Sequence, residues 1–483
     1  MANSGLLERT TPEAQGIPSS AILDFIEALE QHTQPMDASH SLMLLRHDNV
    51  VAEGWWAPYG PTSPHWMYSF SKSFTSSAIG LAVEEGLLTV NDPVLKFFPD
   101  EAPADPSDNL KAMTVKHLLS MNTGHANEPT TTVFWGEDDN WPRAFLSLPV
   151  EKEPGTWFLY NTAATYMLSA IITKLTSQTL LDYLTPRLFE PLGIENPAWD
   201  VDPQGINLGG TGLHITTEDI ARFGQMYLQK GVWNGQRILP EAWIEEATQA
   251  TSDNSNQPSN PDWIQGYGYQ FWRCQHGFYR GDGAHGQYCV VMEAQDAVLA
   301  MTSGVRDMQA VLDKVWEHLL PAMQAEPLPA NPDAHSKLTE KLASLSLPMP
   351  QGTPTSPQAE ATSGKLYTLE TNDLNLKGVK LAFGDEGSTL TLVTPAGEQT
   401  VSVGYETWAR STAELREYGE EVIAASGAWT DDSTYTVYLS FYESEVGVIF
   451  TFHFEGDNLR MTYEPNVSWV STDVQTIKGH TTN

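Results

Sequence analysis

The chain has 483 residues, more than a single hydrophobic core usually sustains, so its length predicts at least two domains. Its 61 acidic residues outnumber 26 basic ones and give a net charge of −35. So negative a surface repels phosphate backbones and anionic lipids, which argues against nucleic-acid and membrane partners.

Targeting and redox signals are sparse. Residues 1–16 lack the basic segment and apolar run of a secretory signal, and no apolar stretch is long enough to span a bilayer. We therefore expect a cytoplasmic protein. With only Cys274 and Cys289, the chain cannot hold a disulfide framework. Two buried free thiols are expected in a reducing compartment, and a single bridge is the alternative.

The first predicted elements are a helix and a hairpin. Residues 19–32 carry apolar side chains at helical spacing behind a serine pair that can cap the helix. Short apolar runs at 42–46 and 50–56, divided by His-Asp-Asn, predict a β-hairpin. Helical patterns then alternate with loops marked by Gly and Pro. Aromatic and β-branched runs within 266–304 predict adjacent antiparallel strands, and a helix is expected at 311–323.

The composition changes after residue 324. Residues 325–363 are rich in Pro, Ser, Ala and Gln, with one modest helical pattern at 335–345, and are interpreted as a linker between a first domain, 1–324, and a last one, 364–483. The last domain is nearly all strand-like, with alternating apolar and polar residues at 389–393, 401–405, 435–442 and 448–454. This pattern predicts a small antiparallel barrel or sandwich.

One candidate for catalytic chemistry is Ser69-Phe70-Ser71-Lys72, at the start of a predicted helix that ends at Gly86. Three residues apart on a helix, Ser69 and Lys72 project from the same face. A serine hydroxyl becomes a good nucleophile when a neighbouring base removes its proton, and burial can lower the pKa of a lysine enough for that task. Alone the pattern is weak, because a capped helix with a solvated lysine would look the same.

Two further stretches strengthen this candidate. The sequence P-G-T-W-F-L-Y-N-T at 154–162 ends a loop with Tyr160 and Asn161 before a helical pattern, which can place a phenol in a pocket. The sequence R-G-D-G-A-H-G-Q at 280–287 leads into a strand, and its glycines, Gly283 among them, let a substrate lie close to the backbone. The alternatives are a tyrosine packed at a helix entrance and a tight turn without function.

The order S-x-x-K, then Y-N-T, then a Gly-rich strand resembles the serine β-lactamase and penicillin-binding-protein superfamily, in particular its esterase and 6-aminohexanoate-dimer-hydrolase branch. Stretches at 116–124, 187–194 and 212–224 resemble the same branch. The resemblance covers about residues 8–323. It implies an α/β (α+β) domain with an antiparallel sheet flanked by helices, and an active site in the cleft between its two parts.

The resemblance also implies roles for individual residues. Ser69 would be the acylated nucleophile, Lys72 its base, and Tyr160 the group that shares the proton relay and protonates the leaving group. The backbone N–H groups of Ser69 and Ala284 would form the oxyanion hole. Asn161 would orient the substrate or Lys72, although the family often places this Asn one position later.

The third motif departs from the family. Where β-lactamases carry Lys-Thr-Gly, this chain has Gly281-Asp282-Gly283. An aspartate there would repel the carboxylate of a β-lactam or a terminal D-alanine, and Arg280 or His285 would have to compensate. We therefore expect a hydrolase of small carboxylic esters or amides. A β-lactamase or D-alanyl carboxypeptidase, and a catalytically idle binding or regulatory module, are the alternatives.

Other motifs carry less. Gly281-x-Gly283-x-x-Gly286 satisfies a dinucleotide fingerprint, but a strand pattern follows where that fingerprint needs a helix. The thirteen histidines have no ligand spacing, so neither a metal nor a cofactor is expected. Trp55, Trp56, Trp135 and Trp141 could line an acyl pocket, but burial in a core is the safer prediction for each. The C-terminal domain could cap the cleft or join copies of the chain into a homo-oligomer.

Overall fold

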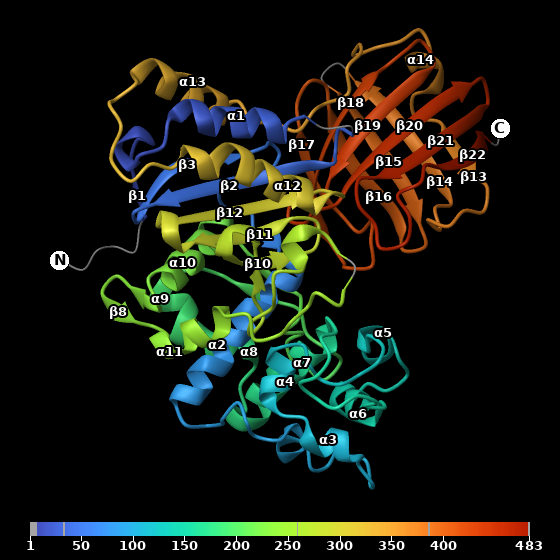
Figure 1. Cartoon of the computed structure of the whole chain (residues 1–483). Helices are drawn as coiled ribbons and strands as arrows, with labels where there is room; N and C mark the ends of the chain where they lie inside the picture. The colour runs from blue at the N-terminus through green and yellow to red at the C-terminus, as the bar shows by residue number, and fades with distance from the viewer. Residues whose placement is uncertain (1–6, 32–33, 258, 385–386, 482–483) are drawn as a thin grey trace.

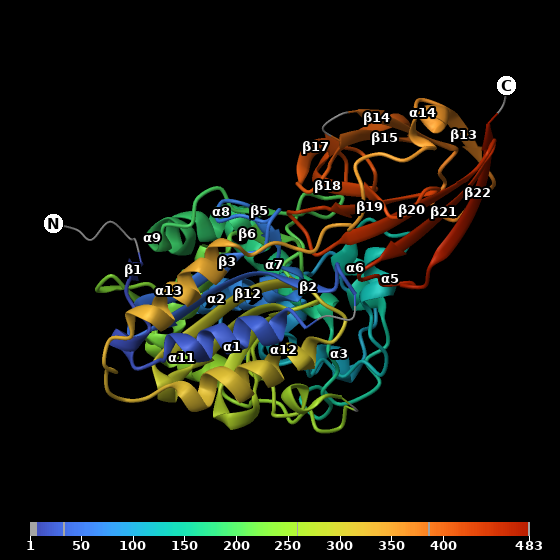
Figure 2. The ribbon, with the colours of Figure 1, turned by 90° about the horizontal axis from the view of Figure 1, so that it is seen from above.

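The computed structural model describes residues 7–31, 34–257, 259–384 and 387–481 (Figure 1). Residues 1–6 of the segment expected to lack a secretory signal lie outside these ranges, as does residue 32 of the first expected helix. A mixed α/β domain and a β-barrel stand side by side as separate bodies, most clearly when seen from above (Figure 2). No helix in the described ranges is long and apolar enough to cross a membrane.

The first domain is built on a seven-stranded sheet whose order is β1-β3-β2-β12-β11-β10-β9. All neighbours are antiparallel except β1 and β3. The expected hairpin is β2–β3, and the strands expected within 266–304 are β9 to β12. The strands are β1 (Glu8–Arg9), β2 (Ala38–Arg46), β3 (Asn49–Trp55), β9 (Trp272–Arg273), β10 (Tyr279–Gly283), β11 (Gln287–Met292) and β12 (Ala297–Gly304).

Side chains alternate between two separate cores across this sheet, as the period of two in a strand requires. On β2, Leu42 and Leu44 belong to the core under α1 (Ser19–Leu29), α12 (Met308–Lys314) and α13 (Pro332–Ala343). Met43 and Leu45 point to the opposite core. That face is covered by α2 (Ser71–Glu84) and α10 (Thr217–Leu228) (Figure 1). Both faces are therefore buried.

A helical part extends the second core away from the sheet. Between α2 and α10 it contains α3 (Asp108–Ala112), α4 (Val115–Leu119), α5 (Thr130–Phe134), α6 (Trp141–Ser147), α7 (Thr162–Thr176), α8 (Leu180–Leu184) and α9 (Glu190–Leu192). A small sheet of β4 (His65–Trp66), β6 (Leu213–Ile215) and β5 (Ala198–Trp199) lies beside it. The chain continues through β7 (Val232–Trp233), β8 (Gln236–Arg237) and α11 (Glu241–Thr248). The expected α/β domain with flanking helices is confirmed.

The segment interpreted as a linker is partly built into the first domain. Leu338 of α13 is 1% exposed and packs in the core that contains α1. Lys341 of α13 forms an ion pair with Glu30 at 2.5 Å. Leu345 and Leu347 are buried in the same core. The stretch from α13 to residue 347 therefore fastens onto the domain it follows.

The C-terminal domain is a barrel, which decides between the two expected β architectures. Its strands run in the order β16-β15-β14-β13-β22-β21-β20-β19-β18-β17, and a parallel pairing of Gly404 with Ser426 joins β16 to β18 and closes the ring. A short helix, α14 (Ala359–Thr362), precedes the strands. These are β13 (Leu366–Leu369), β14 (Gly378–Gly384), β15 (Gly387–Thr394), β16 (Gly397–Gly404), β17 (Ala409–Ala413), β18 (Glu421–Trp429), β19 (Thr434–Ser440), β20 (Gly447–Glu455), β21 (Asn458–Pro465) and β22 (Gln475–Thr481).

Polar contacts dock the barrel onto the first domain. The side-chain amide of Asn466 donates to the carbonyls of Met36 and Gly304, each at 3.0 Å. The Arg306 guanidinium donates to the carbonyls of Pro465, at 3.0 Å, and Asn466, at 2.6 Å. Because these partners are buried or partly buried, the contacts hold the end of β21 close to the end of β12.

We predict that Leu338→Ala destabilises the first domain, because it leaves a cavity between α13 and α1. Such truncations cost about 2–5 kcal/mol. The melting temperature of the first-domain transition, followed by calorimetry, should fall. Leu366→Ala on the barrel, where the side chain is 45% exposed, is the control and should leave that transition in place. An unchanged transition in Leu338→Ala would show that α13 is dispensable for the core.

Candidate active site

Ser69 lies in a 3₁₀ turn, Tyr68–Phe70, that runs directly into α2. The residue before it, Tyr68, has a φ of 47°, so the turn bends sharply at the entrance to the helix. Phe70 and Phe74 are fully buried and fix the turn against the core, whereas Ser69 is partly exposed. The hydroxyl is thus presented to solvent from a rigid support.

Lys72 is buried beneath Ser69, with 1% of its surface exposed. Its Nζ donates hydrogen bonds to the Oγ of Ser69 at 2.9 Å, the Oγ1 of Thr162 at 3.1 Å and the carbonyl of Gly210 at 2.7 Å. These three acceptors come from the turn that carries Ser69, the start of α7 and the loop before β6. The predicted pair of Ser69 and Lys72 is therefore within direct hydrogen-bonding distance.

Burial lowers the pKa of Lys72 to about 7, since an ammonium group loses its hydration there. The negative charges of Glu128 and Asp282 act in the opposite direction. A large fraction of the amines is then neutral near pH 7. A neutral amine can accept the proton of Ser69 along the contact that already joins the two atoms.

Tyr160 lies on the other side of Lys72, whose Nζ is 5.0 Å from the centre of the phenol ring. Its ring stacks on Trp272 with centroids 5.2 Å apart and meets the edge of Tyr267 at 6.1 Å. Burial raises the pKa of the phenol, and a hydrogen bond with Ser69 opposes that shift. Tyr160 therefore keeps its proton at neutral pH and is within reach of Ser69.

Asn161 has a different place from the one expected. Its carboxamide oxygen accepts from the backbone of Ala164 at 2.9 Å and caps α7, while its amide donates to Thr123 at 3.3 Å. Both ends of this fully buried side chain are used within the helical part. The hydroxyl beside Lys72 belongs to Thr162, which was not among the expected site residues.

The strand β10 lies against the turn that carries Ser69 because the strand contains two glycines. A Cβ on Gly281 would meet the ring of Phe70 at 2.0 Å, and one on Gly283 would meet the carbonyl of Met67 at 2.2 Å. Gly283 thus makes room for the turn, whereas its expected role was to make room for a substrate. The two approaches place β10 directly against the turn that carries Ser69, and Ala284 follows β10 in the chain.

Arg280 and Asp282 form a buried ion pair at 2.7 Å. Arg280 is 0% exposed and also donates to the carbonyl of Asp262 at 2.8 Å. The expectation that Arg280 binds a substrate carboxylate therefore needs correction, because its side chain lies inside the protein. The same pair offsets the charge by which Asp282 was expected to repel such a carboxylate.

His285 is partly buried, with a φ of 64°, beside the aromatic rings of Tyr68 and Trp469. Burial lowers its pKa to about 4, so the imidazole is neutral at pH 7. A neutral ring offers no positive charge to a carboxylate. Neither residue expected to compensate for the missing lysine does so by charge.

The barrel contributes residues that were not among those expected at the site. The hydroxyl of Tyr68 donates to the carboxylate of Glu445 at 2.5 Å, and Trp469 contacts the rings of Tyr68 and His285. Residues nearly 400 positions apart meet here, and no local pattern signals such a contact. Trp469 and Val470 are exposed in the structure, 74% and 96% respectively.

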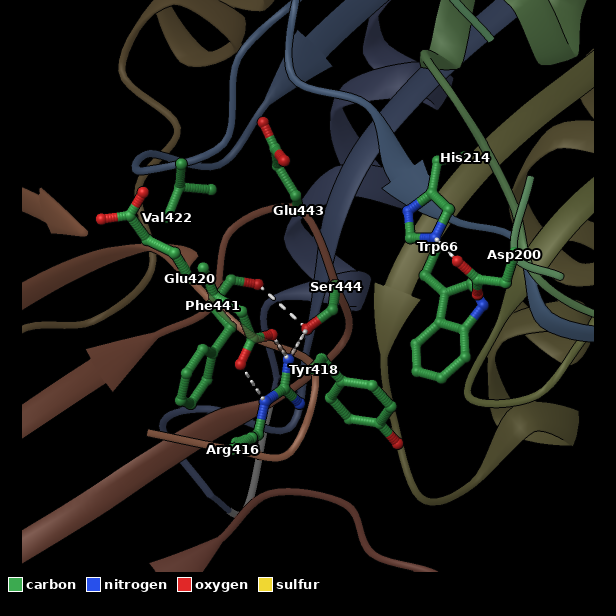
Figure 3. A pocket seen from close by; sticks show the side chains of 11 residues that line it. Trp66, Asp200, His214, Arg416, Tyr418, Glu420, Val422, Phe441, Glu443 and Ser444 are labelled. Carbon is green, nitrogen blue, oxygen red and sulfur yellow. Dashed lines mark hydrogen bonds and ion pairs between the residues drawn. The ribbon is translucent and has the colours of Figure 1, made fainter. Parts of the chain in front are cut away.

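A cavity of about 280 Å³ lies between the two domains (Figure 3). Trp66, Asp200 and His214 line it from the first domain, and Arg416, Tyr418 and Glu443 are among its barrel residues. Arg416 turns towards Glu421, with which it forms an ion pair, and towards Ser444. The cavity is thus adjacent to the turn that bears Ser69, and it has an acidic lining.

Remaining expectations concern the minor motifs. Cys274 and Cys289 are free and buried, as expected. Trp56 and Trp141 are buried, as expected, whereas Trp135 is 75% exposed. Gly286 leads into β11, so the dinucleotide fingerprint lacks its helix. Within the described ranges no group of three or more His, Cys, Asp or Glu residues could hold a metal ion.

Comparison with known proteins agrees with this geometry. The model of the beta-lactamase family matches residues 29–319. The chain belongs to this family. It is similar to the 6-aminohexanoate-dimer hydrolase of Paenarthrobacter ureafaciens, with 24% identity over 317 residues that make up 62% of this chain and 80% of the relative. The resemblance drawn from the motifs is confirmed.

Two solved structures share the fold. The hydrolase EstCE1, described as having promiscuous acyltransferase activity, has a TM-score of 0.52 and 17% identity, and the match covers 62% of this chain and 99% of that one. An octameric penicillin-binding-protein homologue from Pyrococcus abyssi has a TM-score of 0.50 and 16% identity. That match covers 95% of this chain and 99% of the other. The family relationship places this chain among the hydrolases.

We predict that Gly283→Ala separates β10 from the turn that carries Ser69. The new methyl group would press on the Met67 carbonyl, and neither backbone can yield without moving the other. Overpacking of this kind costs about 1–3 kcal/mol, and a displacement of about 1 Å can slow catalysis roughly 100-fold. The decrease in catalysis is measured as the rate of Ser69 acylation by an activated ester. Gly60→Ala, whose Cβ would meet only Ser63 Oγ at 3.9 Å, is the control.

The pH dependence of acylation should report Lys72. Because only the neutral amine is a base, the second-order rate should rise with pH through an apparent pKa near 7. Glu128→Gln removes a charge that raises this pKa, so the rise should move to lower pH. Glu151→Gln is the control, since that carboxylate accepts a backbone hydrogen bond from Ala126 nearby. A profile that is flat from pH 6 to 8 would exclude Lys72 as the base.

Proposed function

We propose that the protein is a serine hydrolase that cleaves small carboxylic esters or amides through an acyl-enzyme at Ser69. The observation that carries this proposal is the contact of a partly exposed Ser69 with a buried Lys72 whose pKa is about 7. A lysine in a purely structural role has no need of such an environment. The beta-lactamase family relationship supports the same chemistry.

Acylation would begin with the transfer of the Ser69 proton to the neutral Nζ of Lys72. The Oγ of Ser69 then attacks the substrate carbonyl carbon and forms a tetrahedral oxyanion. The N–H groups of Ser69 and Ala284 would donate to that oxygen. The C–O or C–N bond to the leaving group breaks as Tyr160 gives it a proton, and Tyr160 recovers a proton from Lys72. Proton balance is then complete.

Deacylation would use a water molecule and the same groups in reverse. The water gives a proton to the neutral Nζ of Lys72 as its oxygen attacks the acyl carbon. The bond between that carbon and Ser69 Oγ breaks, and Ser69 regains its proton. A carboxylic acid leaves, and Lys72 returns to its neutral form.

The charges around the site favour uncharged substrates. Arg280 is buried in its pair with Asp282, His285 is neutral, and Glu128 adds a negative charge near Lys72. A β-lactam or a peptide ending in D-alanine carries a carboxylate that these groups do not neutralise. Uncharged esters and linear amides carry no carboxylate that the site would have to neutralise. They are therefore the proposed substrates ahead of β-lactams.

We predict that a fluorophosphonate probe modifies Ser69 in the folded protein, as shown by peptide mass spectrometry. Ser69→Ala should take up no label, and Lys72→Ala should react at least about 100-fold more slowly at pH 7, as expected when a general base is removed. Short p-nitrophenyl esters should turn over faster than nitrocefin. Absence of label from Ser69 would favour an idle module of the same fold, and faster nitrocefin turnover would favour a β-lactamase.

A homo-oligomer is part of the same proposal. The octameric homologue from Pyrococcus abyssi matches this chain across both domains. The net charge of −35 opposes close association of copies at low ionic strength. Light scattering at low and high salt measures the assembly state directly.

A further inference from the structure

We propose that the C-terminal barrel supplies an apolar subsite beside Ser69, in which Trp469, Tyr68 and His285 bind an aromatic or alkyl group of an uncharged ester or amide. This inference rests on the proposed function of Ser69. It assigns a substrate-binding role to a domain outside the residues that the beta-lactamase family covers, 29–319.

Trp469 is the central residue of this subsite. Its ring lies 5.4 Å from that of His285 and 6.0 Å from that of Tyr68, measured between centroids. Despite these contacts, the side chain is 74% exposed. It belongs to the loop 466–474, where Val470 is 96% and Val474 is 55% exposed. An apolar surface of this kind, left uncovered on a strongly acidic protein, is typical of a binding site.

The two rings that Trp469 contacts lie next to the reacting groups in the chain. Tyr68 directly precedes Ser69, the proposed nucleophile, in the chain. His285 directly follows Ala284, the proposed oxyanion donor. The loop of the barrel therefore reaches the two backbone segments between which the substrate carbonyl would be held.

Hydrogen bonds and ring contacts hold Tyr68 and the start of the loop 466–474 in place. Tyr68 donates to Glu445 at 2.5 Å and stacks on Trp66 with centroids 4.4 Å apart. The loop begins at Asn466, whose amide also donates to the Glu445 carbonyl at 2.8 Å. Together with the contacts of Asn466 to the first domain, these bonds anchor the loop at its start and leave its apolar tip free.

The residues of the subsite favour an uncharged, apolar ligand. Aromatic rings bind apolar groups and other rings through stacked or edge contacts. His285 is neutral at pH 7, and the Glu445 carboxylate already accepts a hydrogen bond from Tyr68. The neighbouring cavity between the domains is lined by the carboxylates of Asp200 and Glu443 (Figure 3). An anionic group would be repelled there, and an uncharged aromatic or alkyl group would not.

The test compares two ester series on the wild-type protein and Trp469→Ala. One series varies the acyl group from acetyl to octanoyl and phenylbutyryl with a fixed leaving group, and the other varies the alcohol with a fixed acetyl group. In one of the two series, kcat/KM for the largest members should fall about tenfold, whereas the smallest member should change less than twofold. The responding series shows which part of the substrate occupies the subsite.

Leu366→Ala is the matched control, since it removes an exposed apolar side chain of β13, on the far side of the barrel (Figure 1). If Trp469 forms a subsite, Trp469→Ala loses activity mainly on esters with large groups. General damage to the protein would instead lower kcat/KM for all esters alike. An unchanged profile, or an equal loss for small and large esters, would overturn the proposal.

A binding measurement keeps the subsite separate from the catalytic proposal. Saturation-transfer NMR with phenylbutyl acetate on Ser69→Ala needs no turnover. Binding that is lost in Ser69→Ala/Trp469→Ala supports the subsite even if the wild-type protein hydrolyses no ester and Ser69 takes up no label. Equal binding by the two proteins would overturn the subsite and leave the role of Ser69 to the labelling experiment.

Discussion

The removal of water from one ammonium group is the constraint on which the rest of the first domain depends. Lys72 would be protonated near neutral pH in water, and only burial brings its pKa to about 7. That burial needs α2 below it, the start of α7 beside it, the Gly210 loop as a further wall and β10 against the turn. Segments that lie 90 and 138 positions further along the chain, together with β10, therefore enclose a residue near its beginning. The helical part and the sheet meet where this one side chain must be enclosed.

The effect of burial on the pKa of Lys72 is larger than that of the nearby negative charges. Thr162 and the Gly210 carbonyl are neutral, so they satisfy the amine without holding its proton strongly. Glu128 and Asp282 are the charges that would hold it, and Arg280 lies 2.7 Å from the Asp282 carboxylate. The Gly-Asp-Gly sequence in place of Lys-Thr-Gly is thus half of an internal pair. The aspartate of this sequence, Asp282, has its ion-pair partner in Arg280, two residues before it.

The motifs predicted the part of the site that local spacing controls. Ser69 and Lys72 lie on one helical turn, and the glycines at 281 and 283 had to serve a close approach, so both were visible in the sequence. The partners of these residues were not. Thr162 replaced Asn161 beside Lys72 because a buried helix N-terminus needed the asparagine as its cap. Arg280 was expected to compensate for the missing lysine, because nothing local shows that β10 is buried on both faces. Alternation predicted the strands of the last domain, but the pairing that closes the barrel joins Gly404 to Ser426, and such long-range register has no local signal.

The pairing of β2 with β12 has a consequence for the order in which the protein can be made. The second strand of the chain lies in the middle of the sheet and waits for a neighbour that is synthesised about 250 residues later, which takes roughly 10 to 50 s on a ribosome. During that interval the β2–β3 hairpin exposes an apolar edge, and the core it shares with α1 is open. The last wall of that core, α13, arrives later still. The barrel, by contrast, forms from strands that mostly follow one another and can close as soon as they emerge. The slow, exposed stage of folding therefore belongs to the domain that carries Ser69, and a nascent chain arrested before residue 297 would be the form in greatest need of a chaperone.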